Sequence, residues 1–554
     1  MITRKIIDSI FSNYSHAADQ LCEDANVIAT DYLIHNIDYA FDRLSTNRRM
    51  QDITFELFCE YVLPYKWVEK QPLDHWRDTR SDRFGNTIET TFCDEGDINK
   101  ISLIANLIID EMEDTIRYTF GIPHNDYGFL SASTMYKIPY GLCSNYTDIF
   151  VSILRSQGIP AAVDMTPQWG HGPLGHTWCT IFDNDGRSIV LPWGFDKEFG
   201  SQLTLHSPLT KVYRRTYKPD ERTSSILNRI DLPSLAPYRF LKDVTDEYRP
   251  VSNIIIPVFK NAQNHEVAGI AAFDRSDWNV IGLGEVKNGK AYFDKLGRGV
   301  VYLVYTYDGT KFRPGSYPFI LHYDGDIQML IPDTVSSASV ELRRKYFKTE
   351  HVAKMENRIR GGRIEASDSA NFKNPVKLFE FTDMNYPDLI PIRINKPYRY
   401  WRFRGADSSY CSINELHFYE RGKNTILKGR IIGTKEALDS LRCIGNVFDG
   451  DWLTGFDYIR ANGGWVGLDF GKPVFIESVR CVPRSDDNAI HFGDTYELKY
   501  WGKDGWVSLG IQKAESGVLY CESVPPNALL ILHNHTRGTE ERIFTWEDDK
   551  QKWW

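Results

Sequence analysis

Apolar residues recur along the chain in two different periods. From Ile6 to about Trp67 they follow helical spacing, and the stretch from Ile98 to Tyr118 repeats that pattern. From about residue 245 onward, short runs of alternating apolar residues are separated by turn pairs such as Asp308-Gly309 and Asp324-Gly325. This change of period predicts a helical N-terminal part followed by a β-rich part.

Length and composition limit the class of protein. At 554 residues, with about 150 residues per domain, the chain should contain three to four domains. Apolar residues make up 42% and charged residues 25%, which is typical of folded chains. The net charge of -9, without a block of Lys and Arg, argues against a nucleic-acid partner. No apolar stretch is long enough for a transmembrane helix, and no signal peptide is expected in the chain.

One segment carries candidate chemistry, and it centres on Cys143. Gly141 ends the preceding element, an apolar helical face follows, and Gly158 with Pro160 should end that helix. Cys143 therefore should lie at a helix N-terminus, where the helix dipole and unpaired N–H groups favour an anion. We expect this to lower the pKa of the thiol and to provide the Cys143 backbone N–H as an oxyanion donor.

A candidate partner follows at His176. The residues from Gly175 to Phe182 read as a strand, and residues 183–187, Asp-Asn-Asp-Gly-Arg, form a hairpin turn. A His at the start of a strand packed on the Cys143 helix could take the thiol proton and return it to a leaving amine. The alternative is that both residues are ordinary core residues.

The motif resembles a known catalytic core. Gly141-Leu-Cys143, the helix ending in Gly158-Ile-Pro160, and His176-Thr-Trp178 before a hairpin resemble the transglutaminase-like superfamily over about Ser131 to Asp196. The resemblance implies a papain-like α+β fold with Cys143 as nucleophile and His176 as base. In that family an Asp usually orients the His.

The third member of the site departs from the family pattern. The strand after the hairpin has no acid at the usual offset, so we expect Asp196 to fill the role, with Asp183 a weaker candidate. Trp169, Trp178 and His171 are expected to line the cleft wall. His171 and His176 fit a metal pair only loosely, so no metal site is expected there.

The C-terminal part resembles a second family. Residues 398–405, 448–454 and 464–473 resemble a discoidin, or coagulation-factor type C, domain. This implies an eight-stranded jelly-roll β-sandwich that binds carbohydrate or lipid head groups, of which we expect carbohydrate. Asp449 and Asp451 form an oxygen-rich loop that could hold Ca²⁺, although a turn-stabilising role is the stronger alternative; no other cofactor is expected.

The complete prediction is a multidomain α+β and all-β chain resembling multi-domain proteins of Bacteroidetes-type bacteria. Its expected parts are a helical lead-in, a transglutaminase-like core, a middle β-sandwich, a polar linker and a discoidin-like sandwich, over residues 1–85, 86–240, 245–340, 341–389 and 390–554.

The function expected from these parts is a cysteine-dependent amide hydrolase, acting outside the cytoplasm on glycoprotein or peptidoglycan-like substrates and binding carbohydrate through its C-terminal domain. Two alternatives stay open. One is an inert glycan-binding or adhesion protein, and the other is a peptide:N-glycanase-like amidase. The sequence leaves the oligomeric state undetermined.

Overall fold

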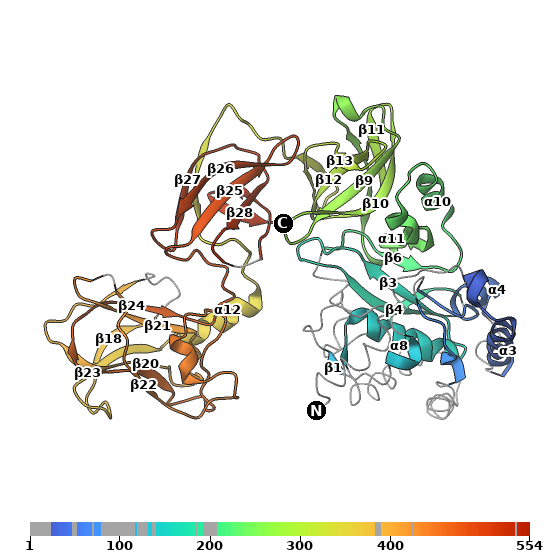
Figure 1. Cartoon of the computed structure of the whole chain (residues 1–554). Coiled ribbons are helices and arrows are strands. Elements are labelled where there is room, and N and C mark those ends of the chain that lie inside the picture. Colours follow the sequence, from blue (N-terminus) through green and yellow to red (C-terminus); the bar gives the residue numbers. More distant parts are fainter. Residues whose placement is uncertain are drawn as a thin grey trace. The chain divides into compact units, whose positions relative to one another are not determined.

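The computed structural model describes residues 24–46, 53–68, 71–78, 117–118, 131–135, 140–183, 185–191, 208–382, 389–423, 425–537 and 540–554. The chain forms two compact units (Figure 1), residues 1–331 with 501–505 and 554, and residues 332–500 with 506–553. The expected class is confirmed: helices come first, and antiparallel sheets form most of the rest. None of the helices in the described ranges has the length and apolar character needed to cross a membrane.

The N-terminal helices begin the first unit. They are α2 (Asp24–Val27), α3 (Thr30–Thr46) and α4 (Phe55–Tyr61). Thr54 caps α4, because its side chain accepts a hydrogen bond from the N–H of Leu57 at 3.2 Å. The expected helix from Ile98 to Tyr118 lies outside the described residues except for β1 (Arg117–Tyr118), which pairs in parallel with β2 (Tyr140–Gly141). A short helix, α7 (Ala132–Met135), precedes β2.

The helix that begins at Cys143 lies against an antiparallel sheet (Figure 1). This helix is α8 (Cys143–Ser156), and Gly158 follows it with a positive φ of 80°, as its sequence predicts. The sheet order is β5-β4-β3-β6-β7. Its strands are β3 (Ala161–Thr166), β4 (His176–Phe182), β5 (Ser188–Val190), β6 (Tyr213–Arg215) and β7 (Leu241–Asp243).

The two faces of this sheet contact different cores. On the α8 side, Cys179 and Ile181 of β4 pack with the apolar face of the helix. On the other side, Trp178 packs with Val212 and Val244. Three further elements follow β6 in this part: α10 (Glu221–Leu227), η2 (Pro233–Phe240) and α11 (Thr245–Tyr248). Alternate residues of β4 thus serve opposite sides of the sheet.

The first unit continues into a β-rich part with its own core. Its strands join in one antiparallel sheet of order β15-β14-β12-β9-β10-β11-β8, with β13 paired to β12. These strands make up the part that was expected to be a middle β-sandwich. The elements are β8 (Val251–Pro257), η3 (Lys260–Ala262), β9 (Val267–Phe273), β10 (Trp278–Lys287), β11 (Lys290–Gly297), β12 (Val300–Tyr307), β13 (Phe312–Pro314), β14 (Phe319–Leu321) and β15 (Ile327–Met329). The predicted turn at Asp308-Gly309 is present, with Gly309 at a φ of 96°.

The second unit contains a sandwich around Trp401 and Phe418. One sheet has the order β18-β17-β20-β23-β22 and the other β19-β24-β21. The elements are α12 (Glu350–Glu356), η4 (Asn357–Ile359), β17 (Arg363–Ser367), β18 (Val376–Glu380), β19 (Ile390–Pro391), β20 (Tyr398–Arg404), β21 (Glu415–Glu420), β22 (Arg430–Gly433), η5 (Ile444–Phe448), β23 (Trp465–Val474) and β24 (Ile476–Val482). The expected linker at 341–389 is therefore wrong, because β17 and β18 belong to this sandwich.

A separate core in the second unit surrounds Tyr496 and Phe544. One sheet has the order β26-β25-β28-β29-β30, and β16 pairs with β27. The strands are β16 (Ala338–Leu342), β25 (Thr495–Trp501), β26 (Trp506–Lys513), β27 (Leu519–Val524), β28 (Leu530–Asn534), β29 (Phe544–Glu547) and β30 (Lys550–Trp553). Residues 390–554 therefore contribute to two cores, where a single discoidin-like sandwich was expected.

Candidate functional site

Cys143 is the first residue of α8, as its sequence predicts. The preceding residue, Leu142, is extended, and its N–H donates to the side-chain oxygen of Asn145 at 3.0 Å, which fixes the start of the helix. Burial raises the pKa of the Cys143 thiol, while N–H groups of Thr177, Ser144 and Cys143 and the hydroxyl of Thr177 oppose this effect. The expected low pKa is therefore corrected: removal of the thiol from water outweighs the donors at the helix start.

His176 is the first residue of β4, where it pairs with Thr166 of β3. Its ring stacks on two tryptophans. The ring centroids of Trp169 and Trp178 each lie 5.9 Å from that of His176, at interplanar angles of 24° and 26°. Burial lowers the pKa of His176 to about 4, so its imidazole is neutral at pH 7. Both tryptophans expected in the cleft wall are thus neighbours of His176.

The two predicted catalytic side chains have different described neighbours. Thr177 faces the Cys143 thiol on the α8 side of the sheet. Trp178, the residue after Thr177, packs on the other side of the sheet, and the His176 ring contacts both Trp178 and Trp169. The structure brings Cys143 together with Thr177, and His176 together with the tryptophans. The sequence analysis assigned no role to Thr177. Its position two residues before Cys179 was a usable signal, because residues two apart in a strand share one face of the sheet.

The predicted orienting acids have different outcomes. Asp196 lies outside the described residues, so its role stays a prediction. Asp183 accepts a hydrogen bond from the N–H of Arg187 at 2.7 Å and closes the turn between β4 and β5. It follows the far end of β4, about 20 Å along the strand from His176. Asp183 is therefore a turn residue and does not orient His176.

A buried polar network lies behind Trp178, and sequence reasoning missed it. The indole N–H of Trp178 donates to the hydroxyl of Tyr248 at 2.9 Å, and that hydroxyl donates to Asp164 at 2.6 Å. Arg214 donates to both carboxylate oxygens of Asp164, at 2.9 and 2.8 Å. Burial alone would lower the pKa of Arg214, but the Asp164 carboxylate outweighs it and raises that pKa. The network holds the ring that stacks on His176.

His171 was expected in the cleft wall and has a different contact. Its Nε2 lies 2.8 Å from the carbonyl oxygen of Gly299, at the start of β12. Gly175 closes the same loop, because a Cβ there would collide with the carbonyl oxygens of Thr166 and Pro167. The loop from His171 to Gly175 is therefore held by close backbone packing.

Within the described ranges, the side chains of His35, His75 and Asp78 are the group able to share a metal ion, with ligand atoms all within 4.8 Å of one another. All three are exposed, and the Nε2 of His35 lies 2.8 Å from a carboxylate oxygen of Asp78.

The Asp449 loop is built by its own hydrogen bonds. Asp449 accepts from the N–H of Asp451 and the hydroxyl of Thr454, both at 2.8 Å, and Asp451 accepts from the N–H of Leu453 at 2.9 Å. These contacts are those of turn-stabilising side chains, which favours that alternative over calcium binding.

Comparisons with known proteins give a partial similarity to solved structures. No family model matches the chain, and no curated protein matches it. A similar solved structure is described as "a Putative Cysteine Protease from Cytophaga hutchinsonii", with 15% sequence identity and a TM-score of 0.19. The match covers 26% of this chain and 43% of that one, so the chain spans less than half of the structure it matches. The class defined here is a multidomain α+β protein with a β-rich C-terminal part.

Proposed function

We propose that the chain is a cysteine-dependent amide hydrolase with Cys143 as its nucleophile. The observation that carries the proposal is the position of the thiol at the first residue of α8, facing N–H groups of Thr177, Ser144 and Cys143 itself. Donors in this arrangement can stabilise a thiolate and then the oxyanion of a tetrahedral intermediate.

In this proposal, His176 is the general base, and its neutral imidazole is the form that accepts a proton. The imidazole takes the thiol proton as sulfur attacks the amide carbonyl. Collapse of the intermediate breaks the C–N bond, and the imidazolium returns the proton to the leaving amine. Water then hydrolyses the thioester, which releases a carboxylate and restores the thiol. Asp196 is the proposed orienting acid.

The proposed substrates are glycoproteins or peptidoglycan-like material, and the proposed location is outside the cytoplasm. Carbohydrate binding is assigned to the sandwich around Trp401. These assignments rest on analogy with the families that the sequence resembles.

A second candidate is an inert glycan-binding protein. The stacking of His176 on Trp169 and on Trp178 favours it. In that case the imidazole serves as a packed core residue.

The test is turnover of a denatured N-glycoprotein by the full chain and three variants. Cys143→Ala and His176→Ala should each abolish turnover, whereas Cys443→Ala, which removes an exposed thiol, should retain it. Cleaved peptide with the glycan still on Asn supports the hydrolase, and release of intact glycan assigns the amidase. Two results would exclude Cys143 as the nucleophile for this substrate. One is equal turnover by Cys143→Ala and the wild type, and the other is binding of glycan by the wild type without any turnover.

A further inference from the structure

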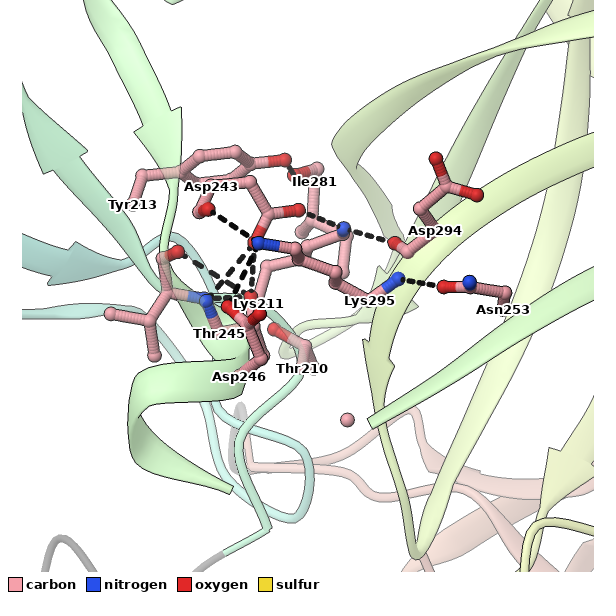
Figure 2. A network of polar contacts seen from close by, with 12 residues as sticks. Thr210, Lys211, Tyr213, Asp243, Thr245, Asp246, Asn253, Ile281, Asp294 and Lys295 are labelled. Atoms are coloured by element: carbon pink, nitrogen blue, oxygen red, sulfur yellow. Dashed lines mark hydrogen bonds and ion pairs between the residues drawn. The ribbon is translucent and has the colours of Figure 1, made fainter. Parts of the chain in front are cut away.

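A cavity of about 390 Å³ lies in the first unit, away from Cys143. Its walls come from β6, α10 and β7 on one side and from β8, β10 and β11 on the other. This volume is near the lower end of the range of roughly 300–1,000 Å³ for small-molecule sites. Figure 2 shows a network of polar contacts that includes the lining residues Lys211, Tyr213, Asp243, Asn253, Asp294 and Lys295.

The floor of the cavity contains a buried cation, Lys211, whose residue is 5% exposed. Its ammonium pairs with the carboxylate of Asp243 and donates to the carbonyl oxygen of Asp294 at 2.5 Å (Figure 2). An ammonium has three N–H donors. The described contacts occupy two of them, which leaves one for a ligand.

The carboxylates of the cavity are already engaged. Asp243 accepts from the hydroxyl of Thr245 at 2.6 Å in addition to Lys211. Asp220 caps α10 by accepting from the N–H of Thr223 at 2.8 Å. These acceptors are therefore committed to the fold.

The cations at the rim have donors to spare. Arg222 uses one N–H for the carboxylate of Asp294, and a guanidinium has five. Lys242 is exposed, and no carboxylate within the described ranges pairs with its ammonium. The lining contains four cationic side chains, of Lys211, Arg222, Lys242 and Lys295, against three carboxylates, of Asp220, Asp243 and Asp294, so its formal net charge is +1, which favours an anionic ligand.

The backbone of β11 is distorted at the cavity. The pairing of β11 with β8 shifts between Phe293 and Leu296, and Lys295 has a positive φ of 50°. The side chain of Asn253 accepts from the N–H of Lys295 at 2.9 Å, which holds this bulge (Figure 2). A regular strand would direct Asp294 and Lys295 to opposite faces, whereas both line the cavity.

We infer that this cavity binds a small molecule through a terminal oxyanion, a carboxylate or a phosphate, held by Lys211, Arg222 and Lys242. Ile226, Tyr238 and Leu283 line the same space and contact the remainder of the ligand.

The test is calorimetric titration of the full chain in a phosphate-free buffer with three probes. Benzoylglycine carries a carboxylate, benzoylglycinamide is its neutral match, and inorganic phosphate is the third probe. Saturable binding of benzoylglycine without binding of the amide identifies a carboxylate site. Saturable binding of phosphate alone identifies a phosphate site.

The variants separate this cavity from other surface sites. Lys242→Gln and Arg222→Gln should each weaken binding of the charged probe about fivefold, the scale of an exposed charge contact. Lys290→Gln, an exposed lysine at the start of β11, should leave the affinity unchanged. The melting temperature of each variant verifies that it is folded. Any of three results would overturn the inference. Both charged probes could fail to bind, the two rim variants could bind the charged probe as tightly as the wild type does, or the neutral amide could bind as tightly as benzoylglycine does. Because binding is measured without turnover, the result is independent of the role of Cys143.

Discussion

The Asp164–Arg214 pair provides a quantitative test of the buried network behind Trp178. Asp164 is fully buried, the Arg214 side chain is 3% exposed, and two hydrogen bonds join them. Removing one partner of such a pair leaves an uncompensated charge and costs about 3–5 kcal/mol. We expect Asp164→Asn to cost about 3 kcal/mol, the lower end, because Glu247 still pairs with Arg214 at 2.9 Å.

Hydrogen exchange measured by mass spectrometry would report this cost in the peptides that cover β3 and β4. A loss of about 3 kcal/mol corresponds to roughly hundredfold faster exchange of their protected amides. Glu247→Gln is the matched control, and it should cost below about 1 kcal/mol because its side chain is 34% exposed. Replacing the pair together, with Asp164→Leu and Arg214→Met, should recover much of the loss. Exchange in Asp164→Asn no faster than in Glu247→Gln would refute the reasoning.

Three further outcomes are expected. Burial lowers the pKa of His176 from 6.5 to about 4 in the folded state, so the stability that it contributes above pH 6.5 is lost as the pH falls toward 4. His176→Gln should reduce this loss, as measured by thermal scans at neutral and acid pH. Equal acid sensitivity of the variant and the wild type would contradict the prediction. Gly297→Ala should lower the free energy of unfolding by about 1–3 kcal/mol, because the new Cβ would collide with the carbonyl oxygen of Leu209. An unchanged melting temperature would contradict this close packing. Asp449→Ala should lower the free energy of unfolding by about 1 kcal/mol, with and without added calcium, because the hydrogen bond from Thr454 is lost. A loss of stability seen only with added calcium would support calcium binding by this loop instead.

Local signals in the sequence predicted much of the first unit. The start of α8 at Cys143 follows from Gly141, and its end follows from Gly158, whose positive φ suits glycine. The β4–β5 hairpin follows from Asp183 and the turn residues after it, and Asp183 indeed closes that turn. These features depend on neighbours in the chain, so local sequence is enough to specify them.

Features that depend on pairing between distant strands were not predictable in this way. Asp164 and Arg214 meet because β3 pairs with β6, and nothing near either residue signals that pairing. The stretch 341–389 was predicted to be a linker because it is polar and charged, which is typical of a segment exposed to water. In the fold charges of this stretch are paired with other strands, as where Glu365 of β17 accepts from Arg402 of β20 at 2.6 and 2.8 Å.

The pairing of β16 with β27 has a consequence for synthesis of the chain. Residues 338–342 join residues 519–524, and the complete sandwich around Trp401 is built from the residues between them. The inner sandwich can fold as soon as it leaves the ribosome, whereas β16 must wait unpaired until residue 524 has emerged. A fragment that starts at residue 390 removes β16 and exposes the edge of β27. A recombinant fragment that contains the C-terminal core should therefore begin before Ala338.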